Sequence, residues 1–197
     1  MSQPLSDDAL DQLFRTARSY NGYLDKPVAA GQLHAIWDLL KFGPTSANML
    51  PARLIWCVSR DAREKLAATA TKANALKIQQ APVIVIIGTD MKFQDNIPWL
   101  FPPMPEIGEF FAGRPDHEVM ALRNSSLQGA YFIMAVRALG LDAGPMSGFD
   151  NAAVDAEFFA DAPNVKSNFI STLGYGDPST ISERLPRPDF DTFNTIV

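Results

Sequence analysis

Residues 81–87 read Ala-Pro-Val-Ile-Val-Ile-Ile, and from Val83 onward the run is apolar and β-branched with no alternating polar residue. A strand with one face in water alternates polar and apolar side chains, so this pattern indicates a strand covered on both faces. The sequence therefore predicts a central strand that is part of the hydrophobic core.

Helical patterns lie on both sides of this strand, bounded by capping residues and by Gly or Pro. Helices outnumber strands, and the strands are scattered among them, which favours an α+β fold with helices packed around one sheet. The predicted elements are a helix opened by Ser6, a helix from about Pro27 to Gly43 with Leu33, Ile36, Trp37 and Leu40 on its packing face, a strand over 53–59, a helical stretch from Asp61 that carries Asn74 and Lys77 near its end, a long helix over 118–139, a short helix capped by Asp150, and a strand over 168–174.

The long segment over 118–139 is apolar on most faces around 130–138, so we expect it to be a buried helix. The segment before it, from Met91 to Pro115, combines clustered prolines with Trp99, Phe101, Phe110 and Phe111. That composition is too apolar for an ordinary solvated loop and predicts a lid or an interface arm.

Composition restricts the kind of protein. The 197 residues include 47% hydrophobic side chains, which is enough for a core and favours a single domain over 1–197. A net charge of −5 without clustered Lys and Arg argues against nucleic acid as a partner. The only cysteine, Cys57, lies in an apolar run and is expected to be a buried thiol, which together with an N-terminus lacking a targeting pattern predicts a cytoplasmic protein that does not enter a membrane.

The common catalytic motifs are absent from the sequence. There is no GxSxG, CxxC or HExxH, and the two histidines, His34 and His117, are far apart. No GxGxxG follows a strand, so a Rossmann pyrophosphate site is not expected. We therefore expect neither a metal centre nor a Ser/His nucleophile, and a bound nucleotide would need a different kind of site.

Three polar clusters suggest such a site. They are Arg18-Ser19-Tyr20-Asn21, Pro44-Thr45-Ser46-Ala47-Asn48, and the pair Arg184 and Arg187 in the tail. Guanidinium groups and hydroxyls that converge on one point suit a phosphate group, because the guanidinium directs several N–H donors at its oxygens. Each cluster alone is also typical of an ordinary solvated surface.

The same segments resemble motifs of the FMN-dependent nitroreductase family. Arg18 to Tyr23 is similar to its R-S-x-R-x-F opening, with Asn21 where the second basic residue stands, and Gly43 to Asn48 is similar to its A-P-S-x-x-N loop. Within the family the chain looks closest to the malonic semialdehyde reductases of pyrimidine utilisation, on the runs 42–48, 122–126, 137–150 and 174–177. The resemblance implies a nitroreductase-like fold with a central mixed sheet and an intertwined homodimer that holds FMN between its two subunits.

The resemblance also implies roles for individual residues. The ribityl phosphate would be held by Arg18, Ser19, Arg184 and Arg187, with Asn21 as a further donor. Lys77 would stabilise the negative charge that develops at the pyrimidine edge of the flavin. The remaining implied cofactor contacts are Asn74 at that same edge, Pro44, Thr45, Ser46 and Asn48 on one side of the ring, and Pro145, Met146, Ser147 and Gly148 on another.

The implied reaction is ping-pong, with NADH or NADPH giving a hydride to flavin N5 and the substrate then taking it. For malonic semialdehyde, reduced to 3-hydroxypropanoate, the carboxylate needs a cation, and the candidates are Arg114, His117 and Arg123. A broad nitroreductase or quinone reductase is the alternative enzyme. A flavin-binding dimer without turnover, or a structural dimer without flavin, is the alternative from another class.

Overall fold

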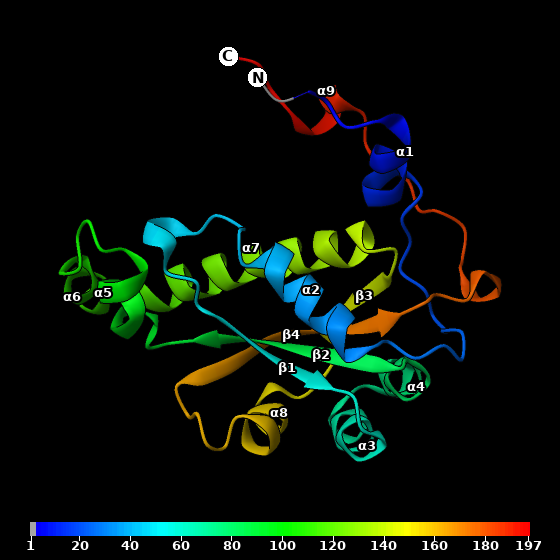
Figure 1. Ribbon diagram of the computed structural model, residues 1–197, viewed down its shortest axis with the longest axis horizontal. Coiled ribbons are helices and arrows are strands. Elements are labelled where there is room, and N and C mark those ends of the chain that lie inside the picture. The colour runs from blue at the N-terminus through cyan, green and yellow to red at the C-terminus, as the bar shows by residue number, and fades with distance from the viewer. Residues whose placement is uncertain (1–2) are drawn as a thin grey trace.

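The computed structural model describes residues 3–197 (Figure 1). The strands are β1 (Ala52–Cys57), β2 (Val83–Asp90), β3 (Asp142–Met146) and β4 (Val165–Gly174). The α-helices are α1 (Asp7–Leu10), α2 (Ala30–Leu40), α3 (Arg60–Thr69), α4 (Lys72–Gln80), α5 (Ile97–Leu100), α6 (Ile107–Ala112), α7 (His117–Ala138), α8 (Asn151–Phe158) and α9 (Phe190–Phe193). A π-helical turn over Asp11–Arg15 continues α1, and short 3-10 turns cover Ser46–Asn48, Phe93–Asn96 and Pro178–Thr180.

The four strands form one sheet in the order β1-β2-β4-β3. Every pair of neighbours is antiparallel, so the mixed sheet expected from the sequence is wrong for residues 3–197. Helices between strands usually produce a parallel crossover, but β1 and β2 are joined by two helices, α3 and α4, that pack on each other. The chain therefore returns to the end of the sheet that it left, and β2 runs back along β1.

Helices cover both faces of the sheet, with α2 and α7 on one side and α3, α4 and α8 on the other (Figure 1). All eight residues of β2 are buried, which confirms the prediction of a central strand covered on both faces. Because side chains alternate along a strand, Val83, Val85 and Ile87 pack with α2 and α7, whereas Ile84 and Ile86 pack with α3, α4 and α8.

The bounds of α7 agree closely with the predicted range of 118–139. Its burial differs from the prediction of a buried helix. One side packs on the sheet and on α2, through residues such as Phe132 and Val136. The other side is in solvent in the single chain, and it exposes Val119, Leu122, Leu127 and Tyr131. A fully buried helix was expected, so this apolar side is an unexplained surface of the isolated chain.

Two other local predictions need correction. The helical stretch expected from Asp61 is broken at Ala70, whose extended backbone forms a bridge with Phe149. Pairing with a segment far along the chain thus overrides local helix propensity. Trp37, expected on the packing face of α2, is 40% exposed, while Ile36 and Leu40 are fully buried as expected.

The segment over 91–115 folds into α5, α6 and a 3-10 turn, which form a small core together with Met49 and the start of α7. Trp99 and Phe110 nevertheless stay exposed on its surface. The role of this segment as a lid or an interface arm stays a prediction. The core of this segment consists of Met49, Phe93, Ile97, Phe111, Met120 and Ala121.

Candidate functional site

A cavity of about 350 Å³ lies between the middle of α7 and the end of β3. Its lining is mostly apolar, with hydroxyl groups only at Ser126 and Ser147. Three of its residues, Pro145, Met146 and Ser147, are ones that the sequence predicted for a flavin ring. The other lining residues are Ala130, Ile133 and Phe169.

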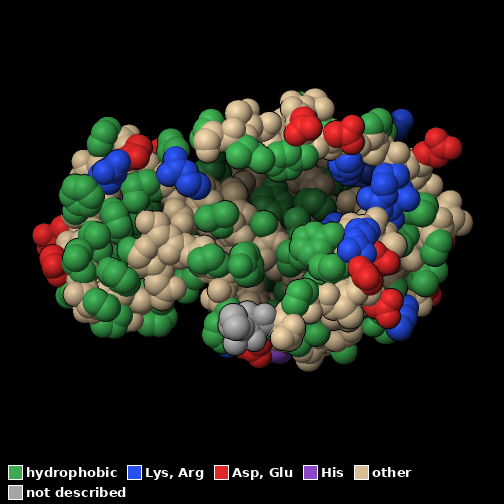
Figure 2. Space-filling view, turned by 90° about the horizontal axis from the view of Figure 1, so that it is seen from above, with side chains coloured by type: hydrophobic (Ala, Val, Ile, Leu, Met, Phe, Trp, Pro, Cys, Tyr) green, Lys and Arg blue, Asp and Glu red, His purple; other side chains and the backbone are tan. Residues whose placement is uncertain are grey.

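A second cavity of about 380 Å³ lies where α7 ends and β3 begins. It is polar, and its lining includes Arg18, Arg137 and Asp142. A strand rises about 3.3 Å per residue, so the four steps from Asp142 to Met146 separate the two cavities by about 13 Å along β3. Viewed from above, the molecule has a central hollow with hydrophobic side chains in it and Lys and Arg side chains along one rim (Figure 2).

The first predicted cluster and the tail lie side by side near the polar cavity. Arg18 donates to the carbonyl of Ser182, and Arg184 donates from Nη2 to the carbonyl of Ala17 at 3.0 Å. Asn21 donates from Nδ2 to the carbonyl of Thr180 at 2.8 Å. The structure therefore brings together residues that are more than 150 positions apart in the sequence.

Two other predicted phosphate ligands are less constrained. Ser19 is exposed, and Arg187 donates to the nearby carbonyls of Leu185 and Pro186 at 3.1 and 3.0 Å. Both belong to the same two segments, but within residues 3–197 no side-chain hydrogen bond joins either of them to Arg18.

Arg137 is a cation at this cavity that the sequence reasoning did not select. Its Nη1 donates to the carbonyl of Leu13 at 2.9 Å. Burial lowers the pKa of Arg137, the charge of Arg184 lowers it further, and Asp142 opposes both effects. Burial likewise raises the pKa of Asp142, whose Oδ2 accepts from the Gly176 amide at 2.8 Å. The sequence signal that pointed to Arg137 was its position at the start of the 137–150 run, directly before the turn.

Helix α4 is bonded to the turn that follows the cavity-lining residues of β3. Asn74 donates from Nδ2 to the carbonyl of Gly148 at 3.1 Å, which joins α4 to the turn after β3. A Cβ on Gly148 would lie 2.7 Å from that same nitrogen, so the close approach requires glycine. Lys77 follows Asn74 by three residues on the same side of the helix. Among residues 3–197, no carboxylate lies within 4 Å of its ammonium group.

The second predicted cluster lies in a loop over residues 44–52, called here the 44–52 loop. Ala47, Asn48 and Leu50 have φ values of 46°, 50° and 39°. Non-glycine residues avoid this left-handed region, at a cost of about 1–2 kcal/mol each. Asn48 uses its amide to donate to the carbonyl of Leu100 in α5 at 2.8 Å, so that nitrogen is already occupied.

The 44–52 loop and the apolar cavity lie on opposite sides of α7. The loop is bonded to α7 at Asn124, whereas the cavity is lined by Ser126, Ala130 and Ile133. At about 100° per residue, these three positions are turned by roughly 180–240° from Asn124 around the helix axis. A single chain therefore does not unite all of the predicted cofactor residues in one site.

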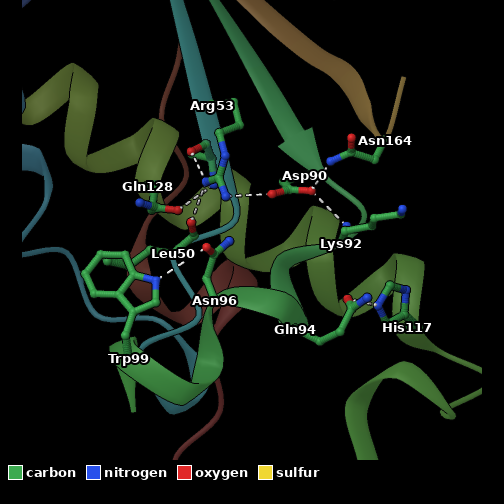
Figure 3. A network of polar contacts seen from close by, with 11 residues as sticks. Leu50, Arg53, Asp90, Lys92, Gln94, Asn96, Trp99, His117, Gln128 and Asn164 are labelled. Carbon is green, nitrogen blue, oxygen red and sulfur yellow. Dashed lines mark hydrogen bonds and ion pairs between the residues drawn. The ribbon is translucent and has the colours of Figure 1, made fainter. Parts of the chain in front are cut away.

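Two of the three candidate substrate cations have structural partners. Arg114 forms a bidentate ion pair with Asp116, from Nε to Oδ1 at 2.6 Å and from Nη2 to Oδ2 at 2.9 Å. His117 is stacked on Phe93, with ring centroids 4.8 Å apart, and its Nε2 is 3.0 Å from Gln94 Oε1 (Figure 3). Arg123 is exposed on α7, and within residues 3–197 no carboxylate lies within 4 Å of it.

A partly buried polar network next to the 44–52 loop was not predicted (Figure 3). Arg53 pairs with Asp90 at 2.6 Å and also donates to the carbonyl of Leu50 at 3.0 Å. Asp90 accepts from Asn164 Nδ2 at 2.6 Å, and Gln128 accepts from the Ala52 amide at 2.8 Å. The sequence signal for the Gln128 part of this network was the group of polar residues at 124–128, in the middle of an otherwise apolar helix.

Metal sites and membrane-spanning helices are both absent from residues 3–197. Residues 3–197 contain no group of three or more His, Cys, Asp or Glu side chains placed to hold a metal ion. In the same part of the chain, none of the helices has the length and apolar character that crossing a membrane would require.

Comparison with known proteins adds independent information. Residues 14–175 match the model of the family described as the nitroreductase family. Two bacterial relatives, both provisionally named NADH dehydrogenase/NAD(P)H nitroreductase, come from Stenotrophomonas maltophilia strain K279a (52% identity over 191 residues, 97% of each chain) and Burkholderia lata (54% over 193 residues, 98% of each chain).

Solved structures share the fold at low sequence identity. A provisionally named nitroreductase from Bacillus subtilis superposes with a TM-score of 0.84 at 19% identity, over 98% of this chain and 100% of the other. One from Exiguobacterium sibiricum, solved in complex with FMN, has a TM-score of 0.80 at 19% identity, over 94% and 96% of the two chains.

Proposed function

The chain belongs to the nitroreductase family, and from this we infer that it is a flavoprotein that carries FMN and passes electrons from NADH or NADPH to a small organic acceptor. The enzyme class is oxidoreductase. The observation that carries the cofactor proposal is the pair of cavities along β3, one apolar and one lined by arginine, about 13 Å apart. A flat ring joined by a chain to a phosphate needs that combination of surfaces.

The residues present fit FMN. In the proposal, Arg18 and Arg184 hold the phosphate with Ser19, Asn21 and Arg187, because guanidinium groups bind phosphate through paired N–H donors. The ring occupies the apolar cavity against Pro145, Met146, Ser147 and Gly148. Asn74 and Lys77 meet its pyrimidine edge from α4, which the bond from Asn74 to Gly148 brings to this point.

We propose that the site is completed by a second copy of the chain. Pro44, Thr45, Ser46 and Asn48 lie on the far side of α7 from the cavity, so they reach a flavin ring only if it is bound by the other subunit. Apolar residues exposed along α7, among them Leu127 and Tyr131, give a homodimer a surface to bury.

Bound FMN supplies two-electron transfer between the nicotinamide and the acceptor. The chain holds the ring, stabilises negative charge at its pyrimidine edge through Lys77, and leaves one face open to both substrates in turn. No side-chain nucleophile is needed for this chemistry.

The physiological acceptor is proposed at two levels. The names of the relatives support a broad NAD(P)H nitroreductase or quinone reductase. Malonic semialdehyde is the more specific candidate, from the long sequence matches over 137–150 and 122–126. Arg123 favours it, because an exposed arginine without an ion-pair partner is available to a substrate carboxylate, unlike Arg114 and His117.

We further propose that the protein acts as a single FMN-binding domain in the cytoplasm, where the unpaired thiol of Cys57 would stay reduced.

The cofactor proposal is tested by the absorption spectrum of the purified protein after incubation with excess FMN and desalting. We expect one FMN per subunit, released unchanged by denaturation. A colourless protein after this treatment would overturn the flavoprotein assignment.

A further inference from the structure

The strained backbone of the 44–52 loop is the feature that needs a physical cause. Ala47, Asn48 and Leu50 all have left-handed φ values, although none of them is glycine. Such conformations persist only where the surrounding structure fixes them, and they are concentrated at functional sites. The contacts that fix this loop therefore identify residues with a part in its function.

Helix α7 supplies two of these contacts from one side. Asn124 Oδ1 accepts from the Ser46 amide at 2.8 Å, and Gln128 Oε1 accepts from the Ala52 amide at 2.8 Å. Residues four apart lie on the same side of a helix, so the two carboxamides bind the beginning and the end of the loop. They are only 3% and 1% exposed.

The two carboxamides differ in how fully they are bonded. Asn124 also donates from Nδ2 to the carbonyl of Met120 at 2.8 Å, which fixes the orientation of its amide. Gln128 Nε2 is buried and has no hydrogen-bond partner in the described chain. Burying the Gln128 carboxamide with its Nε2 unpaired costs free energy. The hydrogen bond that its Oε1 makes to the loop is therefore the reason we infer for its presence in the core.

The middle of the loop is held by one bond within the loop and by one bond from the sheet. Thr45 Oγ1 accepts from the Leu50 amide at 3.2 Å, and Arg53 donates to the Leu50 carbonyl at 3.0 Å. Arg53 is oriented in turn by its ion pair with Asp90 (Figure 3). The loop is thus bonded at its beginning, middle and end to the rigid parts of the fold.

We propose that Asn124 and Gln128 are positioning residues that hold the 44–52 loop preformed in its left-handed conformation, so that Pro44 to Ser46 are ready to contact the flavin. This inference rests on the proposed FMN function. A preformed loop lowers the ordering cost of binding, whereas a loose one must pay it when the cofactor arrives.

The test compares Asn124→Ala with Ser125→Ala in the full-length protein. Ser125 is the matched control, because it is equally buried on α7 but bonds to Thr89 in β2, at 2.6 Å, and not to the loop. We expect both variants to lower the thermal midpoint of the apoprotein similarly. Only Asn124→Ala is expected to raise the FMN dissociation constant, by about tenfold, as loss of one buried hydrogen bond implies.

A rescue variant tests the strain itself. Glycine adopts left-handed φ without a Cβ penalty. Ala47→Gly therefore lowers the backbone strain of the conformation that Asn124 holds in place. Ala47→Gly is expected to restore most of the FMN affinity in the Asn124→Ala background and to change little in the wild type. Equal FMN affinities for Asn124→Ala and Ser125→Ala, or no rescue by glycine, would show that Asn124 is a core residue only.

Hydrogen exchange of the apoprotein keeps this inference separable from the cofactor proposal. Faster exchange over 44–52 in Asn124→Ala, and not in Ser125→Ala, supports the positioning role of Asn124 whether or not the wild type binds FMN. Unchanged exchange overturns it. Absence of FMN binding by the wild type would overturn only the proposed function.

Discussion

The guanidinium of Arg184 donates a hydrogen bond to the main-chain carbonyl of Ala17 across 167 positions of the sequence. Next to it, Arg18 donates to the carbonyl of Ser182 in the opposite direction. Each arginine therefore fixes the segment that carries the other, and each keeps further N–H groups for a ligand. We propose that two guanidinium groups positioned in this reciprocal way form a preformed anion site.

The first prediction concerns this pair. Arg184→Ala should weaken FMN binding about tenfold or more, as expected for loss of a charge-assisted hydrogen bond. Riboflavin lacks the phosphate, so its affinity should change little. Titration of both flavins by fluorescence quenching measures the difference, with Arg60→Ala, in an exposed pair with Glu64, as the control. Equal losses for the two flavins would mean that Arg184 acts on the fold and not on the phosphate.

The second prediction concerns Lys77. Lys77→Ala should slow reduction by NADH and lower the flavin midpoint potential, because negative charge at the pyrimidine edge loses its partner, an effect of about 3 kcal/mol. Stopped-flow reduction and a potentiometric titration measure it. Lys72→Ala, at the exposed start of the same helix, should leave both values unchanged. If Lys77→Ala behaves like Lys72→Ala, Lys77 is an ordinary surface residue.

Much of the fold could be predicted because its signals are local. The apolar run from Val83 and the long helix over 118–139 need only their own residues to be recognised, and both are confirmed. The break between α3 and α4 needs the bridge from Ala70 to Phe149, which no local pattern contains. Sheet direction was missed for the same reason, since it depends on how α3 and α4 pack.

The candidate site shows the same division. Sequence motifs identified the segments of Arg18 and of Pro145 to Gly148, and these two segments lie at the polar and at the apolar cavity. Asn74 is joined to the second of them by its bond to Gly148. Charge alone did not distinguish Arg114, which is paired with Asp116, from Arg123, which is not paired. Ion pairing depends on side-chain geometry, so it was not available from the sequence.

The third prediction is that the protein is a dimer through α7. Leu127→Glu places a charge on its exposed apolar side and should produce monomers that bind FMN poorly, because the partner's loop is lost. Light scattering at micromolar concentration measures the mass. Val58→Glu, similarly exposed at the end of β1, should remain a dimer. A wild-type holoprotein that scatters as a monomer would contradict the prediction.

The fourth prediction concerns alkaline stability. Burial raises the pKa of the Cys57 thiol from 9.0 to about 11. Between these values the thiol ionises in the unfolded chain but not in the folded one, so stability that is fully present below pH 9 is lost as the pH rises to 11. The loss is about 3 kcal/mol.

Urea unfolding at pH 8 and pH 11 measures this effect. Cys57→Ala should be less stable than the wild type at pH 8, because it leaves a small cavity, and the difference should shrink or reverse at pH 11. If the difference in unfolding free energy between wild type and Cys57→Ala is the same at pH 8 and at pH 11, Cys57 ionisation is not linked to unfolding.

The last prediction addresses the substrate. If malonic semialdehyde is the acceptor, the reduced enzyme should be reoxidised faster by it than by an uncharged aldehyde of similar size, because a carboxylate held by a cation fixes the carbonyl in place. Arg123→Ala should remove that preference, since Arg123 is the candidate cation without an ion-pair partner. Arg114→Ala should keep it, because Arg114 is engaged by Asp116.

Stopped-flow reoxidation with both aldehydes, a nitroaromatic compound and a quinone separates the two enzyme proposals. A preference for the anionic aldehyde that depends on Arg123 supports the semialdehyde reductase. Turnover of the flat aromatic acceptors alone assigns the protein to the broad reductases, and Arg123 is then a solvated residue of α7. Loss of the preference in Arg114→Ala but not in Arg123→Ala would mean that the ion pair with Asp116 opens when substrate binds, and that the carboxylate site lies at the start of α7.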